Sequence, residues 1–226
     1  MNQIITSVSL AILLVTGLVA PCFAADTAAL VQRIESQSRA FNTLSTDFTQ
    51  TLKHQQSGTT ETRTGTISFK KPQALRWETT APSKELIVIN DDAIWNYLVD
   101  EEVVYKYPLE MLKDSSSILR FVTGQGEIES DFEVEHEGTE DGLTKLHLYP
   151  FRPQQTLTEA TLWVNETAEI HKVMIVDFYG NENTLTFSNM KFDAPVTDKK
   201  FAFTPPKGVD LEDRTSSTVM EKKLFQ

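Results

Sequence analysis

The chain has 226 residues, of which 40% are hydrophobic and 9% aromatic, and a formal net charge of −11 at pH 7. This length suits a single domain with its own hydrophobic core. The acidic balance argues against binding to nucleic acid, which requires clustered Lys and Arg, and disfavours adsorption to anionic lipid surfaces. It fits a soluble protein or one that meets basic partners.

Residues 1–24 have the pattern of a secretory signal peptide. An apolar run that begins at Ile4 leads to small residues before a cleavage position after Ala24. The run is near the lower length limit for crossing a bilayer and is interrupted by Pro21, which favours cleavage over a transmembrane anchor. We therefore expect export and a mature domain of residues 25–226.

Cys22 is the only cysteine, so cleavage after Ala24 leaves a mature chain without disulfides. The tetrapeptide Val19-Ala20-Pro21-Cys22 also resembles the motif that directs lipid attachment to a cysteine. Pro21 stands where that motif has a small, flexible residue. Lipidation of Cys22 remains an alternative, and it would tether the protein to a membrane.

A helix is predicted from Asp26 and Thr27, which are suited to capping it, to about Gln50. Five apolar residues recur at helical spacing along one stripe of it: Leu30, Ile34, Phe41, Leu44 and Phe48. Because only strands follow, we expect this stripe to pack against a sheet and to close one end of it.

After this helix the pattern changes to the two-residue period of β-strands. The alternating runs are Thr62–Phe69, Leu75–Glu78, Val103–Tyr107 and Leu143–Tyr149. Strands about ten residues apart, separated by turn residues and without helical crossovers, predict an antiparallel meander. One or two short helices are expected between Pro108 and Phe121. The tail from Lys207 is expected to be either a short closing strand or a disordered end.

Six acidic residues occupy alternate positions between residues 127 and 137: Glu127, Glu129, Asp131, Glu133, Glu135 and Glu137. We expect one strand with a carboxylate face and an apolar face that bears Ile128, Phe132 and Val134. A solvated outer wall that discourages edge pairing accounts for the pattern. A docking surface for a basic partner and a weak Ca²⁺ site are the alternatives, although no oxygen-rich calcium loop is present.

The sequence contains no motif for catalysis or for a cofactor. None of the four histidines, His54, His136, His147 and His171, stands beside a nucleophile in a recognisable spacing. There is no Gly-x-Ser-x-Gly turn, His-x-x-x-His pair or glycine-rich phosphate loop. We therefore expect no enzyme, no metal and no cofactor.

Four further motifs follow one another along the mature chain. They are Phe41–Gln50 with its Phe-Thr-Gln ending, Lys71-Pro72 followed by Trp77, Trp95-Asn96-Tyr97, and Phe201–Gly208 with its Pro-Pro pair. Together they resemble the signatures of the LolA family of periplasmic lipoprotein carriers. The resemblance implies a mainly β fold, an incompletely closed antiparallel β-barrel (a curled sheet) covered by a helical lid around an apolar cavity.

The resemblance also implies a function and its partners. The chain would bind the acyl chains of lipoproteins released by an inner-membrane lipoprotein-releasing ABC transporter. It would then deliver them through the periplasm to an outer-membrane lipoprotein acceptor. The resemblance implies a monomer that needs no cofactor and binds no nucleic acid.

The implied cavity and lid residues are Phe41, Leu44, Phe48, Ile67, Phe69, Lys71, Leu75, Trp77, Trp95 and Tyr97. Ordinary core packing is the alternative for each apolar one. Trp95 and Tyr97 are two apart on one strand, so both facing outward is a second alternative for them. Lys71 stands where the family has an arginine thought to hold the lid shut. Lysine makes fewer directed hydrogen bonds, so we expect a looser closed state.

Three rival functions use the same fold. The first is a membrane-anchored acceptor if Cys22 is lipidated, which the mass of the mature N-terminus would reveal. The second is a sensor of envelope lipids, a role that usually comes with an additional domain. The third is a carrier of another lipid or glycolipid, which an apolar cavity does not distinguish from a lipoprotein carrier.

Overall fold

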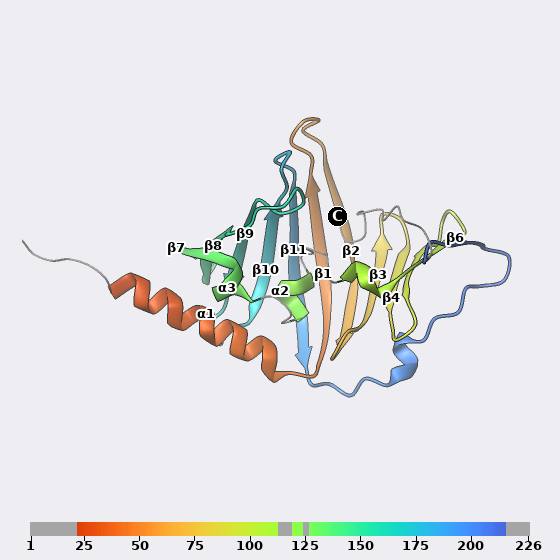
Figure 1. Cartoon of the computed structure of the whole chain (residues 1–226), viewed down its shortest axis with the longest axis horizontal. Coiled ribbons are helices and arrows are strands. Elements are labelled where there is room, and N and C mark those ends of the chain that lie inside the picture. Colours follow the sequence, from red (N-terminus) through yellow and green to blue (C-terminus); the bar gives the residue numbers. More distant parts are fainter. Residues whose placement is uncertain (1–21, 113–118, 124–126, 216–226) are drawn as a thin grey trace, which may run out of the picture.

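The computed structural model describes residues 22–112, 119–123 and 127–215. The apolar run of the expected signal peptide lies outside these ranges. Within them, no helix combines the length and the hydropathy needed to cross a bilayer. The described residues form one twelve-stranded sheet with short helices against it (Figure 1).

The elements in chain order are α1 (Cys22–Ala40), β1 (Thr43–Lys53), β2 (Thr60–Lys70), β3 (Ala74–Ala81), β4 (Glu85–Ile89), β5 (Ile94–Leu98), β6 (Val103–Tyr107), η1 (Leu109–Leu112), α2 (Leu119–Thr123), α3 (Ile128–Asp131), β7 (Phe132–Glu140), β8 (Leu143–Pro150), β9 (Glu159–Val164), β10 (Ile170–Val176), β11 (Glu182–Phe192), η2 (Asp198–Phe201) and β12 (Asp210–Asp213).

The strand order is β12-β6-β5-β4-β3-β2-β1-β11-β10-β9-β8-β7. All neighbouring strands are antiparallel except β12 and β6, which are parallel. Two meanders therefore meet where β1 pairs with β11. The edge strands β7 and β12 do not pair with each other among the described residues, so the curled sheet stays open. The prediction of a mainly β, incompletely closed antiparallel sheet is confirmed.

The two faces of the sheet carry different cores. The inner face packs under α1, α2 and α3 and includes Leu44, Phe48, Ile67, Phe69, Leu75, Trp77, Ile87, Ile89, Leu146, Leu148, Leu162, Val173, Leu185 and Phe187. A smaller cluster on the outer face contains Val88, Trp95 and Val104, with Phe203 of the C-terminal segment packed against it. Cross-strand partners share a face, so the register assigns each side chain to one core.

The predicted long helix is wrong beyond residue 40. Helix α1 ends at Ala40, and Thr43 begins the long strand β1. Leu44 and Phe48 are four residues apart, a spacing that fits both a helix and every second position of a strand. The polar residues Thr46 and Gln50 occupy the intervening inward positions, where both are buried. Because these two inward residues are polar, the sequence of β1 does not show the alternation of apolar and polar residues that marks a strand.

Helix α1 packs its apolar stripe as expected, since Val31 and Ile34 are buried and Leu30 packs against the inner core. The side chain of Glu35 in the same helix is buried as well. Its carboxylate accepts hydrogen bonds from the Glu129 backbone N–H and from the Arg39 guanidinium at 3.1 and 3.0 Å. This pairing connects α1 to α3.

The acidic segment is not one strand. Residues Ile128–Asp131 form α3, and only Phe132–Glu140 continues as β7, with a register shift between His136 and Gly138. Glu133 and Glu135 are exposed, whereas Phe132 and Val134 belong to the inner core. The outer-wall interpretation thus applies to the strand portion alone.

The other local predictions have clear outcomes. Short helices between Pro108 and Phe121 are confirmed by η1 and α2, although residues 113–118 lie outside the described ranges. The tail begins with a short closing strand, because β12 pairs with β6. Residues 216–226 lie outside the described part of the chain.

Candidate functional site

The inner face of the sheet is the candidate binding surface, because it is apolar and covered by helices. Cross-strand registry arranges its side chains in rows that run across the strands. The row nearest α1 contains Leu44, Phe69, Leu75, Ile89, Ile94 and Tyr107, and the next contains Ile67, Trp77, Ile87, Asn96 and Tyr105. Six predicted site residues therefore share this face: Leu44, Phe48, Ile67, Phe69, Leu75 and Trp77.

Phe48 and Trp77 form the aromatic centre of this face. Their ring centroids are 4.8 Å apart, and Gly65 lies beneath them in β2. A Cβ atom at Gly65 would lie 1.9 Å from the Glu78 carbonyl oxygen and 2.9 Å from Cε1 of Phe48. Glycine is therefore required for the Phe48 ring to lie against the sheet and for β3 to approach β2.

The inner face is tightly covered at the α1 end. A cavity of about 20 Å³ remains between Phe41, Leu44, Phe121, Met190 and Phe192, together with nearby α1 residues. Space of this size holds about one water molecule. An acyl chain does not fit in this cavity unless the side chains that line it move apart.

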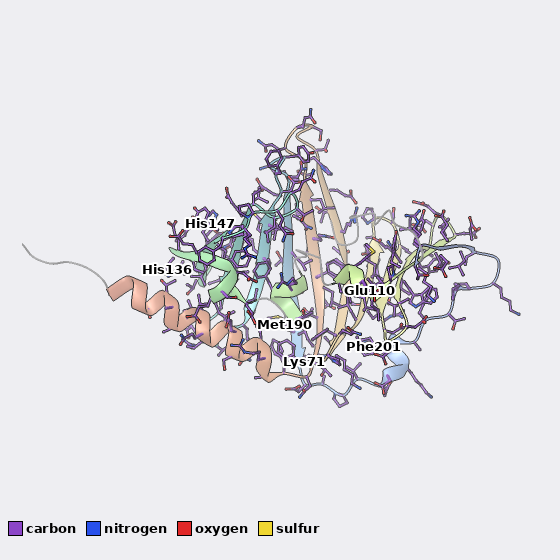
Figure 2. All side chains as sticks on the ribbon, in the orientation of Figure 1. Lys71, Glu110, His136, His147, Met190 and Phe201 are labelled. Carbon is purple, nitrogen blue, oxygen red and sulfur yellow. The ribbon has the colours of Figure 1, made fainter. Side chains whose placement is uncertain are left out.

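Lys71 fastens the end of α1 to the sheet. Its Nζ donates hydrogen bonds to the carbonyl oxygens of Arg39 and Ser38 at 2.7 and 3.2 Å, and it lies 5.0 Å from the Phe41 ring centroid (Figure 2). The last carbonyls of a helix have no intrahelical partner, so a cation is stabilising at this position. Burial lowers the pKa of Lys71 from its usual value, and Asp193 partly opposes that shift.

Trp95 and Tyr97 do not lie with the other predicted site residues. The register places Trp95 beside Val88 and Tyr97 beside Leu86, on the outer face. Both rings pack against Phe203, with centroid distances of 5.5 and 6.2 Å. Their prediction as cavity-lining residues is therefore wrong. The alternative, that both side chains face outward, is confirmed. The C-terminal segment covers them instead.

The inner face becomes polar at the end of the sheet away from α1. There the β1–β2 and β10–β11 hairpins project beyond their neighbours (Figure 1). A cleft of about 470 Å³, the polar cleft, is lined by Leu52, Lys53, His54, Glu61, Arg63, Glu85, Leu98, Thr156, Ile175, Asp177, Asn181, Glu182 and Asn183. Gln50, the next inward residue after Phe48 on β1, donates a buried hydrogen bond to Asn183 at 3.1 Å.

The sequence did not predict the polar end of the inner face, and it did not predict Asn96 within the apolar rows. Asn96 lies in register between Ile87 and Tyr105, and its Oδ1 is buried without a hydrogen-bond partner in the described part of the chain. Gln50 and Asn183 are 133 residues apart in sequence, so only strand pairing brings them together. The signal for Asn96 lies in the Trp-Asn-Tyr motif, because strand alternation places Asn96 on the face opposite to Trp95 and Tyr97.

Among the described residues, the remaining polar groups form no metal centre. Over residues 22–112, 119–123 and 127–215, no three His, Cys, Asp or Glu side chains are arranged to hold a metal ion. His147 lies on the outer face between Glu137 and Glu159, with 3.2 Å from a ring nitrogen to each carboxylate. His147 and the two carboxylates thus form a polar cluster on the outer wall.

These features define a class of proteins in which an open, curled antiparallel sheet has a helix-covered apolar inner face. Residues 39–204 match the family model described as outer membrane lipoprotein carrier protein LolA. The outer-membrane lipoprotein carrier protein of Chromobacterium violaceum is 30% identical over 86% of this chain and 91% of its own length. That of Methylococcus capsulatus is 28% identical over 80% and 87%. The chain belongs to the LolA family, and the expectation of a carrier rather than an enzyme is confirmed by that membership.

Solved structures support the same fold. An uncharacterised conserved protein from Thermus thermophilus superimposes with a TM-score of 0.55 at 15% identity, covering 84% of this chain and 99% of that one. The Mycobacterium tuberculosis lipoprotein LppX gives a TM-score of 0.50 at 17% identity, covering 75% and 98%. At these identities the likeness concerns the fold alone.

Proposed function

We propose that this protein carries lipoproteins by enclosing their acyl chains against the inner face of the sheet. The observation that supports the proposal most directly is the inner face itself, where a continuous apolar surface from Leu44 to Trp77 lies under helices. The naming of its relatives as outer-membrane lipoprotein carrier proteins agrees with it. Phe41, Leu44, Phe48, Ile67, Phe69, Leu75 and Trp77 are the proposed acyl-chain contacts.

The free-energy cost of exposing acyl chains to water makes such an enclosure necessary. Each acyl CH₂ contributes about 0.8 kcal/mol when it leaves water, so exposing one long chain costs on the order of 10 kcal/mol. A soluble carrier removes this cost during transit. Loading is proposed to need movement of α1, and Lys71 is the proposed latch because it holds the end of that helix. A few polar contacts keep the open and closed states close in free energy.

The proposed setting is the periplasm. We infer that residues 1–24 direct export and are removed after Ala24, leaving a carrier domain of residues 25–226. The proposed donor is an inner-membrane lipoprotein-releasing ABC transporter, and the proposed acceptor is an outer-membrane lipoprotein receptor. The carrier needs no nucleotide of its own, because the exporter supplies the energy for release.

Release of lipoprotein from spheroplasts tests this function. Purified protein is added to spheroplasts that synthesise a labelled outer-membrane lipoprotein, and the supernatant is examined for a one-to-one complex. We expect the label to appear in that complex. If the exporter matches and the folded protein releases no label, lipoprotein carriage is contradicted.

Photo-crosslinking then locates the cargo with a matched pair of tyrosines. Tyr105 lies against the inner core, whereas Tyr149 is exposed on the outer side of β8. Benzoylphenylalanine at Tyr105 should crosslink to the acyl chains, and the same residue at Tyr149 should not. Equal labelling at both positions would contradict the inner face as the binding surface.

A further inference from the structure

The polar cleft at the far end of the inner face contains more negative than positive charge. Four carboxylates, from Glu61, Glu85, Asp177 and Glu182, line it against two cations, Lys53 and Arg63. With His54 neutral, the cleft therefore carries an excess of two negative charges. This is the end at which the head of a lipid lies if its acyl chains occupy the apolar rows.

Both cations of the cleft are already paired. Arg63 Nε donates to Glu61 Oε1 at 2.7 Å, and its Nη1 lies 3.9 Å from Glu85 Oε2. Lys53 Nζ is 2.8 Å from Glu182 Oε1. The hydrogen bond from Arg63 lowers the pKa of Glu61 below its usual value, so this carboxylate stays ionised at neutral pH. Each cation thus has its charge balanced before any ligand arrives.

Such a cleft treats charged and uncharged heads differently. An anionic head group entering it meets net negative potential and no uncommitted cation among the lining residues, so its approach is repelled. An uncharged ester or amide carries no net charge and is not repelled in this way. The side chains of Arg63 and Glu85 are only 28% and 21% exposed, so solvent screens their charges incompletely.

We infer that the polar cleft selects cargo by the charge of its head, accepting uncharged glyceryl-ester and amide heads and rejecting anionic lipids. This inference rests on the proposed function, since it assumes that acyl chains bind the inner face. It assigns Glu61 and Glu85 as residues that determine specificity. A carrier in a compartment bounded by phospholipids thereby remains available for lipoproteins, whose acylated N-termini carry no phosphate.

The test compares two lipids that differ by one phosphate. 1-Lauroylglycerol and its 3-phosphate, both below their critical micelle concentrations, compete with the neutral apolar probe N-phenylnaphthylamine for the protein purified from the periplasm of an expression host. We expect the uncharged lipid to displace the probe at about tenfold lower concentration. The preference should shrink at high salt, because ionic screening weakens the repulsion.

The variant Glu61→Gln/Glu85→Gln should abolish the preference, because it removes two negative charges and frees Arg63 to pair with phosphate. Glu133→Gln/Glu135→Gln is the matched control, since it makes the same change of net charge at exposed positions of β7 and should preserve the preference. Retained displacement by 1-lauroylglycerol shows that each variant is folded. If the double variant unfolds, Glu85→Gln alone should reduce the preference.

The outcomes separate this inference from the proposed function. Equal displacement by the two lipids from the unmodified protein would overturn the inference while leaving acyl binding intact, and so would an unchanged preference in the cleft variant. Displacement by neither lipid would contradict acyl binding and the inference with it. A triacylated cysteinyl dipeptide amide and 1,2-dilauroylglycerol, compared in the same assay, show which source of an uncharged head the cleft prefers.

Discussion

Lys71 connects the strand region to α1 through a small number of directed contacts. Its backbone N–H donates to the Asn42 carbonyl at 2.9 Å, and its ammonium bonds the carbonyls of Ser38 and Arg39. Arginine at this position presents a planar fork with five donors, which holds several carbonyls in fixed geometry. We therefore expect the lysine to hold α1 less firmly than an arginine would.

Replacing Lys71 with arginine should slow transfer of cargo to acceptor membranes. We expect the rate of handover to fall about threefold to tenfold, because the closed state gains about 1 kcal/mol. Stopped-flow transfer of a fluorescent acyl cargo measures it. Lys70→Arg is the control, since Lys70 pairs with the exposed Asp198 and not with α1. Handover at an unchanged rate in Lys71→Arg would remove Lys71 from the role of latch.

Asn96 places an amide in the apolar row between Ile87 and Tyr105. A buried acceptor without a partner costs stability, so Asn96→Leu should raise the free energy of unfolding by about 1 kcal/mol. Urea denaturation of the ligand-free protein measures the change. Asn90→Leu should do the opposite, because Asn90 Oδ1 accepts hydrogen bonds from the N–H groups of Asp92 and Ala93 at 3.0 and 3.1 Å. A destabilised Asn96→Leu would mean that the carbonyl is satisfied in solution.

At the level of elements, the close approach of β2 and β3 depends on a glycine. Gly65 lies within a register shift between β2 and β3, beneath the Phe48 ring. Gly65→Ala should destabilise the protein by about 3 kcal/mol, because the new Cβ forces the β3 backbone away. Thermal unfolding measures this. Thr66→Ala, on the exposed side of the same strand, should change stability little, and equal effects of the two substitutions would contradict the steric explanation.

Most strands were predictable because their inward residues are apolar and their turns carry Pro, Gly, Asn or Asp. Strand β1 was not, because Thr46 and Gln50 face inward and satisfy their polar groups on β11. The Thr46 hydroxyl donates to the Ser188 carbonyl at 2.8 Å, and Gln50 donates to Asn183. These contacts connect positions far apart in sequence, so local periodicity carries no sign of them. At α3 the prediction was wrong because alternating carboxylates have the two-residue period of a strand.

For the whole molecule, apolar residues of the inner face could be identified from sequence, but the division of aromatic residues between the two faces could not. Ile67, Phe69, Leu75 and Trp77 were assigned to the inner face by alternation and family resemblance together. Trp77 lies on the inner face and Trp95 on the outer face, and this difference depends on how their strands pair. The polar cleft depends on the same pairing, because its lining residues come from strands in both halves of the sheet.

Cargo should stabilise the whole fold, since it binds the native inner face and not the unfolded chain. A ligand present at one hundred times its Kd contributes about 2.7 kcal/mol, which raises the melting temperature by several degrees. Differential scanning fluorimetry with an uncharged lipid measures the shift. Arabinose or another sugar without an acyl chain is the control and should give none. A melting temperature that ignores every acyl lipid would contradict enclosure by the folded sheet.

The apolar rows of the inner face have a depth that can be compared with that of a membrane. Leu44 to Phe48 spans about 13 Å at about 3.3 Å per residue, and one leaflet of a bilayer has a hydrocarbon depth of about 15 Å. In the proposed binding mode, the apolar rows are about as deep as the hydrocarbon of one leaflet, with the chain ends toward α1 and the heads toward Gln50. Chains much longer than a leaflet would then push their heads out of the molecule.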